Sequence, residues 1–447
     1  MRNEYNIKSE FASEFINKQV GAIVEIKTGY LPYNVEILEI KNKYINAFHS
    51  KLKDGICDSF MAMRSFPTGN DGQPDVNNLI KLMKKQNENQ IAQINVAMEH
   101  YTKIPSFYLF SIISRLDIKD SISHFATLDD IFVHTSLGTE AQYTHCFELL
   151  ASKKEIIISP FVIRILLLLN EKIAIFEKLK QSNLKFQASE LLISQLRKEH
   201  NSEPSKESLA LIDGKPTLID KRYANEIYHK SLNDCISFLE TVTVKNSTIT
   251  KPKNKSKNIF DIFDYDKSIQ HSFHLSCNEN TILWDDDLVM FNVFQSPENL
   301  SSKPKSRVFT QALIQYLANN NFISFNDLIE FQILLLTLNH SFCRFNHKTI
   351  HKVFNDDLYK RLEQRILIYL KESDLINNPD NFGIVSNALT LLMNDSYNFK
   401  AVTTIIDNIH RSQGKQISQH LLNSSLINIQ DCFTKHIFRN FAKHFYS

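Results

Sequence analysis

Apolar residues recur at helical spacing over most of the chain, and short continuous apolar runs interrupt this pattern near its middle. The short runs at 155–158 and 281–284 predict buried parallel strands. Pro160 suits the first turn of a helix that follows the first run. We therefore expect an α/β fold whose central sheet is mainly parallel and is flanked by N-terminal and C-terminal helical regions. The helical spacing itself predicts helices over 35–60, 76–101, 140–152 and 358–447.

Three adjacent carboxylates directly follow the second apolar run. Asp285, Asp286 and Asp287 stand side by side, which costs electrostatic repulsion that a bound cation would relieve. The carboxyl ends of strands in an open α/β sheet are also the usual place for ligands and metal ions. The same residues suit the N-terminus of a helix over 288–294, where one Asp would cap the helix and the helix dipole would favour the others. Metal ligands and a helix cap both stay open as interpretations.

Composition narrows the class of protein more than it identifies a function. The 447 residues carry 51 Lys+Arg against 49 Asp+Glu, a formal charge of +2, so no global excess of positive charge argues for nucleic acid. The six cysteines are scattered without a C-x-x-C pair, which predicts reduced thiols rather than a zinc site or a disulfide framework. The most apolar stretch, 161–169, is broken by Arg164 and is too short to span a bilayer. We expect a cytoplasmic protein with no membrane contact.

One polar and basic stretch, 244–258, has no apolar period and predicts a linker. Its lysines are candidate contacts to a phosphate backbone, although solvated linkers of this composition are common. The candidates are Lys251, Lys253, Lys255 and Lys257.

The segments 309–317, with the sequence FTQALIQYL, and 321–327, with NFISFND, resemble the end of a PIN-like nuclease domain, in particular that of bacterial TPR-GreAB-C-PIN systems. Asn321 stands where that family usually has Gly. The resemblance implies a metal-dependent ribonuclease that uses Mg²⁺ or Mn²⁺. Asp286 and Asp287 match the family's paired acids and are the implied catalytic residues, with Asp285 as a further metal ligand.

The other acids that the resemblance calls for are replaced. Ser159, Gln195 and His271 stand at the positions where the family carries them, and a hydroxyl is a poorer Mg²⁺ ligand than a carboxylate. We therefore favour a degenerate nuclease site in an RNA-binding or protein-interaction module linked to transcription or RNA turnover. The alternative is an active Mg/Mn-dependent endoribonuclease whose site is completed by other acids, such as Glu190, Asp264 or Asp266.

Residues 9–26 resemble the tail of a GreA/GreB-type C-terminal domain. Matching positions include Lys18, Val20, Gly21 and Val24, and they cover about the last strand-turn-strand of that domain. Protein partners and RNA are thus expected, whereas RNA polymerase is a weaker expectation because only the tail is present. A short helix leading into an ordinary hairpin strand explains the same residues.

The predicted organisation has five parts. They are a GreA/GreB-like remnant at 1–30, a helical connector at 31–103, a small helical unit at 104–152, a PIN-like domain at 153–354 that contains the linker, and a C-terminal helical bundle at 355–447.

Overall fold

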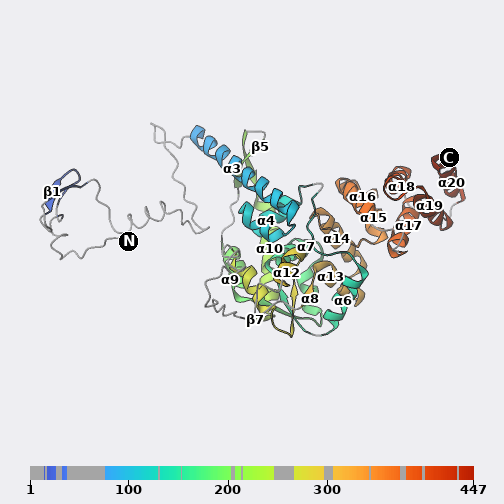
Figure 1. Cartoon of the computed structure of the whole chain (residues 1–447), viewed down its shortest axis with the longest axis horizontal. Coiled ribbons are helices and arrows are strands. Elements are labelled where there is room, and N and C mark those ends of the chain that lie inside the picture. The colour runs from blue at the N-terminus through green and yellow to red at the C-terminus, as the bar shows by residue number, and fades with distance from the viewer. Residues whose placement is uncertain are drawn as a thin grey trace. The chain divides into compact units, whose positions relative to one another are not determined.

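The chain forms two compact units, residues 1–82 and 83–447, in a computed structural model (Figure 1). Each unit is described by itself. The structure describes residues 15, 18–26, 33–37, 76–128, 131–152, 154–202, 207–212, 215–245, 266–295, 306–341, 344–372, 379–394, 398–429 and 432–446.

The described part of the first unit is mainly a two-stranded hairpin. Strand β1, Ile23–Ile26, pairs antiparallel with β2, Tyr33–Glu36. The helix predicted from Val35 is therefore wrong at its start, because Val35 lies opposite Val24 in the hairpin ladder. The remainder of that predicted helix lies outside the described residues.

The second unit contains a five-stranded sheet in which every neighbouring pair is parallel. The strands in sheet order are β7, Thr243–Lys245; β4, Lys185–Ser189; β3, Glu155–Ile158; β8, Thr281–Trp284; and β9, Arg307–Val308. The predicted α/β class with a parallel sheet is thus confirmed. In chain order these strands are third, second, first, fourth and fifth, so the direction of strand addition reverses between β3 and β8. This reversal is the topological switch point of the sheet, where open α/β sheets bind ligands.

Alternate residues of the central strands face two different cores. Ile156, Ile158 and Trp284 contribute to one hydrophobic cluster, whereas Ile157 and Leu283 contribute to another. This division follows from the two-residue period of a strand and shows that both faces of the sheet are covered. The helices that accompany the strands are α7, Pro160–Ile173; α8, Ile175–Gln181; α9, Glu190–Asn201; α10, Arg222–Leu239; α11, Lys267–Leu275; α12, Leu288–Gln295; and α13, Thr310–Asn319.

A separate antiparallel hairpin stands between α9 and α10 in the chain. It consists of β5, Glu207–Ile212, and β6, Lys215–Asp220.

Helices precede and follow the sheet, as the apolar spacing predicted. Before it come α3, Val76–Lys103; α4, Phe107–Ser114; α5, Ile118–Phe125; and α6, Glu140–Ala151. After it come α14, Phe325–Thr337; α15, His347–Asn355; the 3₁₀ helix η2, Asp357–Leu362; α16, Glu363–Glu372; α17, Pro379–Asn394; α18, Phe399–Gln413; α19, Lys415–Ile427; and α20, Cys432–Tyr446. None of the described helices combines the length and the hydrophobicity that crossing a bilayer requires.

Candidate functional site

The three aspartates lie at the carboxyl end of β8, next to the carboxyl end of β3. The register of the two strands brings Ser159 beside them, and the Ser159 N–H donates to the carbonyl oxygen of Trp284 at 3.1 Å. Asp285, Asp286 and Asp287 therefore stand at the switch point of the sheet. All three are buried, with at most 1% of each residue exposed.

Asp285 is held by hydroxyl and backbone donors. The Tyr108 hydroxyl donates to its Oδ1 at 2.6 Å, and the Asp287 N–H donates to its Oδ2 at 3.0 Å. The Ser159 hydroxyl also bonds to this carboxyl group. Burial raises the pKa of Asp285, and the hydrogen bonds from Ser159 and Tyr108 act against that rise.

Asp286 has one bonded and one unbonded carboxylate oxygen. The Thr310 N–H, at the start of α13, donates to Oδ1 at 2.6 Å, whereas the buried Oδ2 has no hydrogen-bond partner. Burial raises the pKa of Asp286 to about 6. The hydroxyl and the N–H of Thr310 act against that rise, and Asp286 is the member of the cluster that has a carboxylate oxygen without a hydrogen bond.

Asp287 joins two helix N-termini. Its Oδ1 accepts the N–H of Met290 at 2.9 Å, which caps the first turn of α12, as the helix-cap interpretation predicted. Its Oδ2 accepts the Ser106 hydroxyl at 2.8 Å and the Tyr108 N–H at 2.9 Å, both from the start of α4. Burial raises the pKa of Asp287 to about 6. Helix α4 is thus fastened to the carboxyl end of β8.

The buried cation nearest this cluster in the sheet is Arg307 on β9. It is 8% exposed, its Nε donates to the backbone oxygen of Asp285 at 2.8 Å, and its guanidinium also donates to the carbonyl oxygen of Thr135. Its charge lowers the pKa of Asp285 and of Asp286, although burial outweighs that effect. Arg307 holds the backbone at the end of β8 and partly compensates the acidic cluster.

Sequence reasoning missed Tyr108, Ser106 and Arg307. The local signal for Ser106 was present, because Ser after Pro105 and before an apolar helix is typical of an N-cap. No local pattern links residues 106–108 to Asp287, which lies about 180 positions further along the chain.

Comparisons of the chain with protein-family models, with curated proteins and with solved structures gave no match.

A divalent ion would need several carboxylate oxygens directed at one point, and this cluster does not supply them. Five of the six carboxylate oxygens already accept hydrogen bonds from the protein; the sixth is Asp286 Oδ2. In the part of the chain that the structure describes, no group of three or more His, Cys, Asp or Glu side chains is arranged to hold a metal ion. The three aspartates thus do not fit the implied Mg²⁺ or Mn²⁺ site.

Ser159, Gln195 and His271, which stand where the resembling family carries acids, do not all lie at the cluster. Ser159 contacts it, as described above. Gln195 instead donates to Asp266 at 3.3 Å, and Asp266 caps α11. His271 lies on α11, and burial lowers its pKa. Between Gln195 or His271 and the three aspartates, the described residues form no hydrogen bond.

Of the remaining candidate acids and cations, the structure describes Glu190 and Asp266. Glu190 is exposed at the first turn of α9. Asp264 and the four linker lysines, Lys251, Lys253, Lys255 and Lys257, lie outside the described residues.

Proposed function

We propose that this chain is a PIN-like protein in which a degenerate nuclease site has become a structural junction. On this proposal it acts by binding, as an RNA-binding or protein-interaction module linked to transcription or RNA turnover, and not by cleaving RNA. The link to transcription or RNA turnover comes from the family resemblance alone. The order and parallel pairing of β3, β4 and β8 are consistent with a PIN-like arrangement.

The observation that carries the proposal is that Asp285, Asp286 and Asp287 are buried and that five of their six carboxylate oxygens accept hydrogen bonds from the protein. A carboxylate that activates a metal-bound water must face a space that admits both the ion and the substrate phosphate. Here the N-terminus of α4 occupies that position, because Ser106 and Tyr108 donate directly to Asp285 and Asp287. Phe107 adds to the closure by stacking on Phe161 of α7 with ring centroids 4.0 Å apart.

The geometry supports a structural role for the cluster. Asp287 orders the N-termini of α4 and α12, and Asp286 orders the start of α13. Aspartate at a helix N-terminus satisfies backbone N–H groups that have no partner within the helix. Three helices are therefore fixed to one end of β8.

Calorimetric titration of Mn²⁺ into the purified protein tests the proposal, together with a cleavage assay on single-stranded RNA. We expect no saturable Mn²⁺ binding and no cleavage that depends on Asp286. The matched variants are Asp286→Asn and Asp287→Asn, each checked by circular dichroism for folding. Saturable Mn²⁺ binding that both substitutions abolish, with cleavage lost in parallel, would instead establish the alternative of an active Mg/Mn-dependent endoribonuclease.

A further inference from the structure

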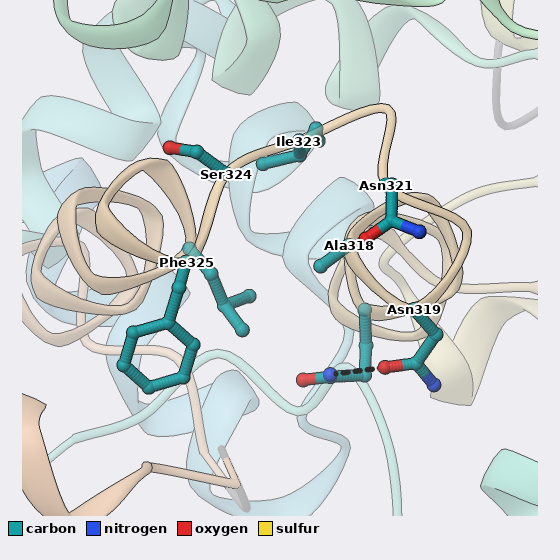
Figure 2. A pocket seen from close by; sticks show the side chains of 8 residues that line it. Ala318, Asn319, Asn321, Ile323, Ser324 and Phe325 are labelled. Atoms are coloured by element: carbon teal, nitrogen blue, oxygen red, sulfur yellow. Dashed lines mark hydrogen bonds between the residues drawn. The ribbon is translucent and has the colours of Figure 1, made fainter.

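A hollow of about 470 Å³ lies between the end of α13 and the start of α14 (Figure 2). None of the three aspartates lines it. Its walls combine side-chain amides, an aromatic ring and aliphatic groups, and no ionisable side chain lines it. The lining residues are Gln315, Ala318, Asn319, Asn321, Ile323, Ser324, Phe325 and Leu328.

Local backbone geometry shapes the hollow. Asn321 adopts a left-handed conformation with φ of 62°, which is the position where the resembling family usually has Gly. Its N–H donates to the carbonyl oxygen of Ala318 at 3.0 Å, and this bond ends α13 and turns the chain. Asn tolerates this conformation better than most residues and also brings a side-chain amide to the rim. The turn therefore supplies both the shape and one polar group.

The start of α14 is fixed by a capping box. The Ser324 hydroxyl accepts the N–H of Asp327, and the Asp327 carboxylate accepts the backbone N–H of Ser324 at 3.1 Å. Asp327 also pairs with Lys178 at 2.5 Å. These contacts hold Phe325, the first residue of α14, in place at the rim. Hydrogen bonds thus fix the backbone on both sides of the hollow, at the end of α13 and at the start of α14.

The chemistry of the walls is divided between two sides. Phe325, with 44% of its surface exposed, lies on one side of the hollow, and Asn319 and Asn321 lie on the other (Figure 2). The Gln315 side-chain NH₂ group donates to Oδ1 of Asn319 at 2.9 Å. This bond fixes the orientation of the Asn319 amide and leaves the NH₂ group of Asn319 available to a ligand. Ile323 and Leu328 are buried and add aliphatic surface.

This combination suits a planar, neutral ring whose edge carries both donors and acceptors. Side-chain amides pair with the hydrogen-bonding edges of nucleobases, and exposed aromatic rings stack on their faces. A lone carboxylate or phosphate would find no cation in the lining, and a purely apolar ligand would leave the amides unpaired. The volume lies within the range of small-molecule sites.

A cation stands just outside the hollow. The ammonium group of Lys348, which is exposed, lies 5.1 Å from the centroid of the Phe325 ring. A base stacked on Phe325 would place its sugar and phosphate near the rim, where Lys348 can meet a negative charge. We propose that this hollow binds the nucleobase of a nucleotide, either free or within a single-stranded nucleic acid.

Binding of defined probes tests the inference and distinguishes the two sources of the base. Calorimetry with AMP, GMP, CMP and UMP measures the free nucleotides, and fluorescence anisotropy with labelled ten-nucleotide A, C and U homopolymers measures single-stranded RNA. We expect saturable binding of at least one probe. Phe325→Ala should weaken it about tenfold, because the substitution removes the aromatic ring on which the base would stack.

Further variants separate stacking from loss of structure. Phe325→Leu keeps an apolar side chain and removes the aromatic face, so it should weaken binding as Phe325→Ala does. Asn319→Ala should weaken binding and change the preference among the four bases. Asn320→Ala removes a neighbouring exposed amide that does not line the hollow, and Tyr223→Ala removes an exposed aromatic ring on α10; both should bind like the wild type.

No binding of any probe would overturn the inference, as would equal binding by wild type, Phe325→Ala and Asn319→Ala. The inference rests on the proposed function in one respect, that the chain acts by binding. The two tests fail separately, because Mn²⁺ titration and RNA cleavage report on Asp286 and Asp287, whereas probe affinity reports on Phe325 and Asn319. RNA binding that all hollow variants retain would keep the proposed function and reject this site.

Discussion

At the residue scale, Asp286 combines full burial with a carboxylate oxygen that has no hydrogen-bond partner. Burial raises its pKa from 3.8 to about 6, so the folded state binds a proton more tightly than the unfolded state does. The contribution of this proton to the free energy of unfolding is fully present below about pH 4 and is lost as the pH rises through about 6. One pKa unit corresponds to about 1.4 kcal/mol, so the difference corresponds to about 3 kcal/mol for this one group.

Asp286→Asn should remove that contribution to the pH dependence. Urea unfolding at pH 4.5, 6 and 7.5 should give a shallower decline in the free energy of unfolding than wild type shows. The variant should be at least as stable as wild type at pH 7.5, because Asn keeps an acceptor for the Thr310 N–H and carries no buried charge. Asp287, whose pKa is also raised to about 6, should maintain part of the slope in the variant.

Asp407→Asn is the matched control, because Asp407 pairs with Arg411 on a helix surface and contributes little. It should retain the wild-type slope. A large loss of stability in Asp286→Asn at pH 7.5 would contradict the prediction and would indicate that the negative charge is required.

The sequence allowed us to predict that the three aspartates end a strand, but not which groups they bind. Three adjacent acids after an apolar run correctly indicated the end of a strand and an unusual electrostatic environment. Whether they face solvent, a metal ion or protein donors depends on Ser106 and Tyr108. Such a contact across the chain leaves no trace in local spacing, so the sequence alone could not decide between metal ligands and helix cap.

At the scale of elements, Arg365 connects α16 to the ends of two other helices. Its Nη1 donates to the carbonyl oxygens of Leu336 and Thr337 at 2.6 and 2.8 Å, at the end of α14. Its Nη2 donates to the carbonyl oxygens of Ala126 and Leu128 at 3.0 and 3.1 Å, just after α5. The last carbonyl groups of a helix have no partner within it, and a planar guanidinium can satisfy several of them at once.

Arg365→Met should destabilise the protein by about 3 kcal/mol, because it removes a donor to the carbonyl oxygens of Thr337 and Ala126 and one of two donors to those of Leu336 and Leu128. Arg365→Lys should recover only part of this loss, since an ammonium group lacks the planar fork that reaches both helix ends. Urea unfolding measures both changes. Arg361→Met is the control on an exposed arginine of η2 and should change stability by less than about 0.5 kcal/mol. Equal effects at the two positions would contradict the bridging role.

Whether a segment forms a helix or a strand was easier to predict from the sequence than where the element begins and ends or what it contacts. The continuous apolar runs became β3 and β8, and Pro160 opens α7 after the Ser159 cap. The error at Val35 arose because four residues of a hairpin also satisfy a helical spacing when the window extends beyond them. The two-residue strand β9 has no period of its own and exists because it pairs with β8.

At the scale of the whole molecule, the division near residue 82 predicts that the second unit folds without the first. The helix α3 crosses this division, and the side chains described as buried in it, those of Ala97 and Tyr101, lie in the part that belongs to the second unit. Tyr101 also donates to the carbonyl oxygen of Phe132 at 2.7 Å. The buried contacts of Ala97 and Tyr101 therefore lie well inside the second unit.

A chain without residues 1–75 should unfold at a thermal midpoint within about 2 °C of the full chain, a difference of under about 1.5 kcal/mol for a unit of this size. A chain without residues 1–114 is the matched comparison, because it also loses α4 and with it the donors Ser106 and Tyr108. That deletion leaves buried carboxylates of Asp285 and Asp287 short of partners, so its midpoint should fall steeply or the protein should fail to fold. Differential scanning calorimetry at pH 7.5 measures both. If removing residues 1–75 were as damaging as removing 1–114, the two units would depend on each other for stability; if neither deletion mattered, α4 would not be the element that secures the switch point of the sheet.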